Sequence, residues 1–146
     1  MPSLLDPSER EALLERFRAL SSEARPAWGQ LTAPRMVCHL SDQLRVALGD
    51  LPSKDHSNLA TRTLLRLLVV HTSFEPPPGK VQTTPVMLTT QPTSWEEDCG
   101  LFESLVQRLA GSERLAPHPT FGPLSTKEWG RLSWKHINHH LRQFGV

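Results

Sequence analysis

The chain has 146 residues, 38% of them hydrophobic, and its 16 basic and 15 acidic side chains leave a formal net charge of +1. This length fits one domain around one core, so we expect a single domain over residues 1–146. So small a net charge argues against a nucleic acid partner. Two cysteines are too few for a disulfide framework, and no apolar run approaches the roughly 20 residues of a membrane span. We therefore expect a soluble, cytoplasmic protein without membrane contacts.

Two helices are predicted in the first third of the chain. Apolar residues recur at helical spacing over residues 7–20, behind Asp6 as the N-cap. Thr32 is predicted to cap a second helix, which has a proline in its first turn and an apolar stripe until Gly49 ends it.

The middle of the chain changes character. Asn58 is predicted to cap a short apolar helix through about Val70. Residues 72–93 are then rich in proline and threonine, which excludes a long helix there, and we expect at most a short extended piece at 86–88. A loop of this length is either a rim or lid over a site or a plain linker.

Two capping boxes predict the remaining helices. Ser94 and Glu97 open one that ends before residue 111, and Ser125 and Glu128 open the last, which ends near Gly145. Four long helices, one short helix and no paired strands predict an all-α fold. We expect an antiparallel four-helix bundle with one extra short helix and a long Pro-rich loop.

The candidate functional residues are histidines, of which the chain has seven. His136 and His140 are one turn apart on the last predicted helix, so both imidazoles can reach one ion. His139 lies about 100° around that helix and is expected to be a surface or packing residue, or to support the ligands. His39 lies within the apolar stripe of the second predicted helix and is expected to face the interior. The alternative for each is a core histidine bonded to a carbonyl group, but three inward imidazoles favour a metal site formed by His39, His136 and His140.

Neighbouring residues add less. Ile137 follows His136, so the glutamate that serves as the base in HEXXH zinc proteases is missing. Asp42 and Gln43 lie one turn beyond His39 and are candidates to fix an imidazole tautomer, although a solvated position is slightly favoured for Asp42. Cys38 and Cys99 are interpreted as buried apolar groups. His118 is interpreted as a turn residue.

Two segments, WGQLTAPRMVCHLSDQLRVALGD and HPTFGPLSTKEWGRLSWKHINHHLRQFGV, resemble the DinB-like superfamily, and more narrowly a branch with an HHLRQFG-type tail. The resemblance extends from Trp28 to Val146. It implies a four-helix bundle, often dimeric, in which His39, His136 and His140 bind nickel, zinc or a similar ion such as iron or manganese. Members of that superfamily include transferases and isomerases that use low-molecular-weight thiols.

Three functional classes remain open. In the first, a metalloenzyme, three neutral imidazoles leave a position on the ion for water or a thiol, and the reaction is hydrolysis or thiol transfer on a small molecule. In the second, the ion only clamps two helices together in a non-catalytic or stress-related interaction domain. In the third, the histidines are structural. The catalytic residues, the substrate and a possible homodimer are not defined by the sequence.

Overall fold

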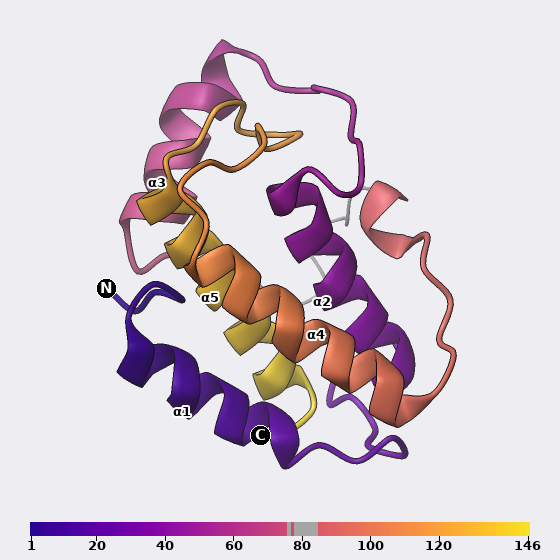
Figure 1. Cartoon of the computed structure of the whole chain (residues 1–146). Coiled ribbons are helices and arrows are strands. Elements are labelled where there is room, and N and C mark those ends of the chain that lie inside the picture. Colours follow the sequence, from indigo (N-terminus) through magenta and orange to yellow (C-terminus); the bar gives the residue numbers. More distant parts are fainter. Residues whose placement is uncertain (76, 78–84) are drawn as a thin grey trace.

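Five α-helices and two short helical segments make up the described part of the chain, residues 1–75, 77 and 85–146 of a computed structural model. Within these residues no strand is present, so the predicted all-α fold is confirmed. In chain order the elements are α1 (Pro7–Arg18), α2 (Ala33–Leu48), the π-helical segment η1 (Thr61–Leu65), α3 (Arg66–His71), the 3₁₀ segment η2 (Pro85–Leu88), α4 (Trp95–Ala110) and α5 (Thr126–Gln143), as shown in Figure 1.

The predicted helix ends are held by the predicted caps. The Asp6 carboxylate accepts from the first-turn amides of α1, and the Thr32 hydroxyl accepts from an amide of α2. Ser125 and Glu128 form a complete capping box at the start of α5. Gly49 ends α2 with φ of 80°, a left-handed conformation that glycine adopts without strain.

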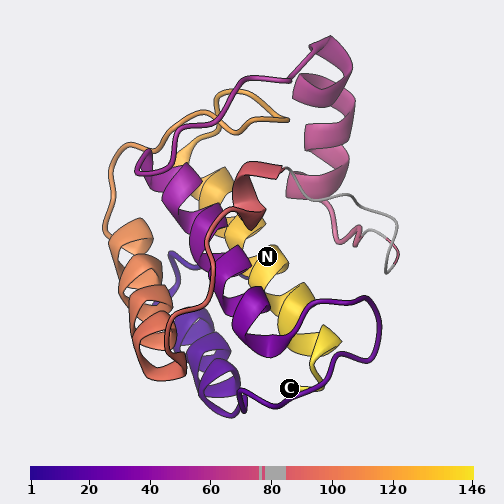
Figure 2. The ribbon, with the colours of Figure 1, turned by 90° about the vertical axis from the view of Figure 1, so that its right-hand side faces the viewer.

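The four long helices form the bundle (Figures 1 and 2). α2 and α5 run antiparallel and side by side, because residues 39 and 43 of α2 contact residues 136 and 133 of α5. α4 runs in the same direction as α2, and α1 in the same direction as α5. The connection across residues 49–94 is long enough to return the chain to the beginning of α2, which makes the parallel α2–α4 pair possible.

The core lies between these four helices. The Phe17 and Phe102 rings pack with centroids 4.3 Å apart and join α1 to α4. Gly130 lets the amino-terminal segment approach α5 closely, because a β-carbon at this position would lie 2.7 Å from the Ser3 hydroxyl oxygen. The Leu4 amide donates to the Gly130 carbonyl at 3.1 Å, and Leu4 is fully buried.

α3 lies at one end of the bundle (Figure 2). Buried Val70 and several polar contacts attach it. Lys135 of α5 donates to three carbonyl groups at and just after the carboxyl end of α3. They belong to Val69, Thr72 and Phe74, at 2.7–3.0 Å. Arg66 makes a two-bond contact with the Glu128 carboxylate at 2.7 and 2.8 Å. The leucines of α3 and of the turns before it are mostly exposed; Leu59, Leu64 and Leu67 are each more than half exposed. The predicted short helix is thus confirmed, but its first turns are π-helical and its apolar side faces outward.

The expected Pro-rich loop is only partly described, because residues 76 and 78–84 lie outside the described residues. The extended piece predicted at 86–88 is wrong. Pro85–Leu88 forms a 3₁₀ turn, which a proline with its fixed φ can begin. Met87 within this turn is buried, and the turn lies against α2. No helix of the described residues is long and apolar enough to cross a membrane.

Candidate metal centre

The three histidines selected from the sequence lie together between α2 and α5. Their ring centroids form a nearly equilateral triangle with sides of 4.7, 4.9 and 4.9 Å, and each pair of rings is nearly perpendicular. One ring nitrogen from each of His39, His136 and His140 lies within 4.8 Å of the other two. His39 and His140 are buried and His136 is partly buried.

His39 is oriented by a backbone carbonyl. Its Nδ1 lies 2.8 Å from the Met87 carbonyl oxygen, which can only accept, so Nδ1 carries the proton. The Nε2 atom of a neutral His39 then has a free lone pair. This Nε2 lies 2.9 Å from Nε2 of His136.

His140 is oriented in the same way by Gln143, a residue that the sequence analysis did not single out. The Gln143 amide nitrogen donates to the Trp28 carbonyl at 2.7 Å, which directs the amide oxygen to His140 Nδ1, also at 2.7 Å. His140 Nδ1 therefore donates, and its Nε2 lone pair is free. The only sequence signal for this contact was the spacing of three residues within α5.

His136 completes the triangle without a fixed partner for Nδ1, which is buried and has no hydrogen bond to any described residue. The first two imidazoles thus present lone pairs by necessity. The third can present one by taking the same tautomer. Without an ion, the neutral His136 donates its Nε2–H to the Nε2 lone pair of His39 across the 2.9 Å contact, which leaves His136 Nδ1 without a partner. A metal ion bound by all three Nε2 atoms would replace this hydrogen bond.

The electrostatics favour the neutral, metal-binding form of all three rings. Burial lowers the pKa of His39, an effect that the Met87 carbonyl and the nearby Asp42 carboxylate partly oppose. Burial, followed by the charges of neighbouring histidines, lowers the pKa of His136 well below its usual value. Burial lowers the pKa of His140 to about 3. At neutral pH none of the three rings has to lose a net proton before a metal ion binds, although the proton of His136 has to move from Nε2 to Nδ1.

The separation of the nitrogens fits a first-row divalent ion. Two nitrogens that each lie about 2.0–2.1 Å from an ion and subtend a right angle are about 2.9 Å apart, and a tetrahedral angle places them about 3.3 Å apart. The 2.9 Å between the Nε2 atoms of His39 and His136 agrees with this range. The 4.8 Å bound on the three nitrogens is wider, so an ion would draw the rings slightly together.

The neighbouring candidates behave differently from one another. The solvated position favoured for Asp42 is wrong, because this side chain is fully buried and accepts from the amide and hydroxyl of Thr90. No hydrogen bond joins Asp42 to an imidazole among the described residues. Gln43 is also buried; its nitrogen donates to the Ser133 hydroxyl at 3.0 Å, and its amide oxygen has no partner in the described chain. Neither residue fixes a tautomer directly.

His139 lies outside the triangle, half-buried beside the Trp28 ring at a centroid distance of 5.8 Å, which confirms the packing interpretation. Cys38 is buried, as expected, and burial raises its pKa to about 11, so the thiol is protonated at neutral pH. Cys99 is half-buried, with a pKa raised to about 11 by the same cause. His118 is a turn residue, as interpreted: its Nδ1 accepts from the amides of Thr120 and Phe121.

A second ionic cluster was missed by the sequence analysis. Glu128 was identified only as a helix cap, yet its carboxylate also accepts from Arg66 and from His71 Nε2. Burial would raise the pKa of Glu128, but hydrogen bonds from Ser125, Arg66 and His71 outweigh it and lower this pKa to about 2. The cluster joins α3 to α5. No local pattern pairs residue 128 with residues 66 and 71, so the sequence held no signal for it.

Comparison with known proteins identifies a family without an activity. Residues 4–145 match the family described as "Protein of unknown function (DUF1569)". This match covers all the helices and all three histidines of the candidate site. No curated protein matches the chain, and no solved structure matches it.

Proposed function

This chain belongs to the DUF1569 family of proteins of unknown function, and from its own site we propose that it binds one divalent metal ion through His39, His136 and His140. The observation that carries the proposal is the convergence of three imidazoles, two of which have their Nδ1 protons fixed on acceptors that point Nε2 inward. Nickel and zinc suit three imidazole ligands best, and iron and manganese suit them less well.

We further propose that the site is catalytic. A divalent ion held by three neutral imidazoles retains an open position and brings the pKa of a bound water or thiol near neutrality. The role of the protein is to keep the three imidazole rings neutral, correctly oriented and shielded from solvent. Hydrolysis or thiol transfer on a small molecule is the reaction class that fits this chemistry.

The polar pair next to the triangle supports an exogenous ligand. Gln43 lies one turn beyond His39 on α2, and Ser133 lies one turn before His136 on α5. The buried amide oxygen of Gln43 lacks a donor among the described residues, and such an oxygen costs free energy unless a water or ligand donates to it. A bound molecule with an O–H or N–H group would provide that donor.

The resemblance to the DinB-like superfamily supports this proposal, because the three metal ligands that it implies are His39, His136 and His140. Thiol transfer is the reaction that this resemblance favours, and hydrolysis is the one that needs no further cofactor. A low-molecular-weight thiol or another small molecule is therefore the proposed partner of the site.

Metal analysis tests the first step. Protein purified without a polyhistidine tag should contain about one divalent ion per chain after equilibration with zinc or nickel and removal of excess metal. His136→Ala and His140→Ala should each lose most of it, whereas His139→Ala, an adjacent imidazole outside the triangle, should keep it. Equal metal content in all four proteins would refute the site.

Cobalt substitution tests the open position. Cobalt(II) bound to the wild-type protein should give a visible spectrum that changes when azide or a small thiol is added, because the added ligand enters the coordination sphere. A response to thiols would favour transferase chemistry. A spectrum insensitive to thiols, azide and carboxylates would show a closed site.

A non-catalytic clamp is the alternative, and one observation favours it. The ligands come from α2 and α5, which are neighbours in the bundle, so a bound ion would join two helices that the core already holds together. In that case chelation should lower the melting temperature, and the cobalt spectrum should not respond to added ligands.

A further inference from the structure

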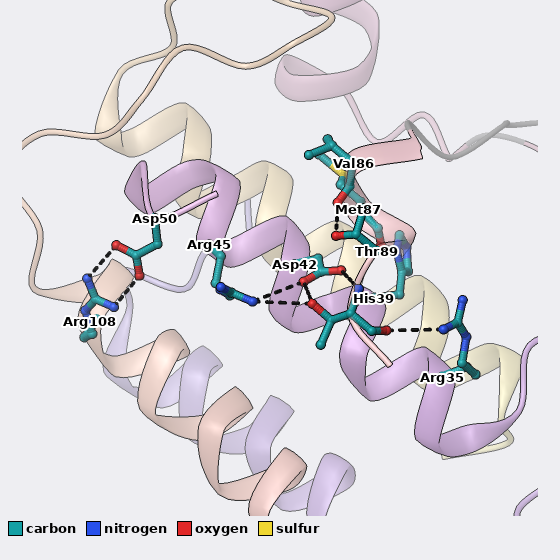
Figure 3. Close-up of polar contacts among 10 residues, drawn as sticks. Arg35, His39, Asp42, Arg45, Asp50, Val86, Met87, Thr89 and Arg108 are labelled. Atoms are coloured by element: carbon teal, nitrogen blue, oxygen red, sulfur yellow. Dashed lines mark hydrogen bonds and ion pairs between the residues drawn. The ribbon is translucent and has the colours of Figure 1, made fainter. Parts of the chain in front are cut away.

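The segment Pro85–Gln91, which we call the strap, lies along α2 and supplies the carbonyl group that orients His39. Met87 is at its centre, with its side chain buried and its carbonyl oxygen 2.8 Å from His39 Nδ1. Figure 3 shows Met87 and its neighbours beside His39, with Asp42 and Arg35 on the same helix directed toward the strap. The contact spans 48 positions in the sequence, so it exists only while the strap is docked.

Asp42 is the main anchor of the strap. Its carboxylate accepts from the Thr90 amide at 3.0 Å and also from the Thr90 hydroxyl. The side chain is fully buried, and Arg45 approaches the same carboxylate at 3.6 Å and the Thr90 hydroxyl at 3.4 Å. A charged acceptor with two donors from one residue is among the stronger hydrogen-bonding arrangements in proteins.

Arg35 holds the strap from the other side of His39, one turn before it on α2. Its guanidinium donates to the carbonyl oxygens of Leu88 and Thr90 at 3.4 and 3.3 Å, and to the Gln91 amide oxygen at 2.7 Å. His39 therefore lies between two anchors on its own helix. Both anchors fix the backbone that bears the carbonyl acceptor of His39.

We propose that Asp42 is a positioning residue for the metal centre, acting on His39 through the strap and not by contact with the imidazole. With Asp42 in place, the Met87 carbonyl keeps the proton of His39 on Nδ1 and directs Nε2 toward His136 and His140. Without it, the strap loosens and His39 samples the other tautomer and other ring orientations. Loss of such an outer contact typically weakens metal binding 10–100-fold.

A matched control exists in the same loop. Asp98, at the start of α4, accepts from the Thr93 amide at 2.9 Å and from the Thr93 hydroxyl at 2.9 Å. This is the same pair of contacts that Asp42 makes with Thr90, three residues further along the chain and outside the strap. Asp98→Ala thus removes an equivalent anchor without freeing the Met87 carbonyl.

The experiment compares Asp42→Ala, Asp98→Ala and the wild-type protein, each as the full chain. Zinc affinity is measured by competition with a chromogenic chelator, and the tautomer of His39 is measured in the metal-free protein from the ¹⁵N chemical shifts of its ring. We expect zinc affinity to fall at least tenfold in Asp42→Ala and less than twofold in Asp98→Ala. We expect Nδ1 of His39 to be protonated in the wild type and in Asp98→Ala, and to become a mixture of tautomers in Asp42→Ala.

Two further variants keep the test decisive if Asp42→Ala does not fold. Thr90→Ala removes one of the two contacts and should shift zinc affinity in the same direction by a smaller factor, and Asp42→Asn should retain part of the wild-type affinity because its amide oxygen still accepts. Equal zinc affinities and unchanged ring shifts in the strap variants would overturn the proposal. This proposal rests on the proposed metal site, but the ring shifts separate the two: a wild-type protein that binds no zinc refutes the site, while the tautomer of His39 still tests the strap.

Discussion

Replacing His118 with asparagine should flatten the acid dependence of the protein's stability. His118 is buried in the loop before α5, stacked on Phe121 at 4.6 Å and near Trp129 at 5.1 Å. Burial lowers its pKa from 6.5 to about 4. Between about pH 6.5 and 4, His118 is therefore protonated in the unfolded chain but not in the folded chain. The free energy of unfolding falls as the pH falls through this interval.

The size of the effect follows from the two pKa values. A difference between 6.5 and about 4 corresponds to about 3 kcal/mol across the whole interval, of which about 2 kcal/mol is lost between pH 7 and pH 5. Asparagine is the appropriate replacement, because its side-chain oxygen can accept from the Thr120 and Phe121 amides as Nδ1 does. The asparagine variant loses the stacking contacts, so its free energy of unfolding is lower at neutral pH. It does not, however, lose the further stability that protonation of His118 costs the wild type at low pH.

Urea denaturation at pH 7 and pH 5, with chelator present to exclude competition between metal and protons, measures this difference. The free energy of unfolding of the wild type should fall by about 2 kcal/mol more than that of His118→Asn over this interval. His56→Asn, which removes an exposed imidazole, should behave as the wild type does. An equal fall in the wild type and His118→Asn would refute the reasoning.

Two other predictions follow from the core and from the cluster that holds α3. Chelation should leave the far-ultraviolet circular dichroism nearly unchanged, because buried apolar residues from all four long helices form the core without the ion; loss of most of the helical signal would make the ion structural. Glu128→Gln should weaken the attachment of α3 by about 1–3 kcal/mol at neutral pH and speed hydrogen exchange of its amides relative to those of α2. Because the pKa of Glu128 is lowered to about 2, the wild type should lose this attachment only as the pH falls from about 4.5 toward 2.

The parts of the fold that could be predicted are those set by neighbouring residues. The caps at Thr32 and Ser125 and the stop at Gly49 fixed the ends of α2 and the beginning of α5 within a residue or two. The meeting of His39 with the pair on α5 also followed, since an inward histidine on one helix and a one-turn pair on another can converge in a bundle.

The parts that could not be predicted depend on contacts between distant segments. The first part of the strap, Pro85–Leu88, is a 3₁₀ turn with Met87 buried, and the buried Asp42 carboxylate is satisfied by two donors of Thr90. Neither contact has a periodicity that a sequence window could detect. The same holds for Gln143, whose amide is directed toward His140 by the Trp28 carbonyl, 115 positions away.

The three imidazoles come from two helices, α2 and α5, and this determines when in folding the proposed ion could bind. His136 and His140 are one helical turn apart and meet as soon as α5 forms, whereas His39 and His136 are separated by 97 positions. Closing a loop of that length costs entropy that local contacts cannot offset, so the complete triangle forms only when α2 and α5 dock. Before docking, the pair on the last helix lacks the third imidazole of the proposed site. At the proposed metal centre, high-affinity binding would therefore report the finished bundle. Any binding of excess metal to the unfolded chain during refolding would reduce the net stabilisation that the ion provides.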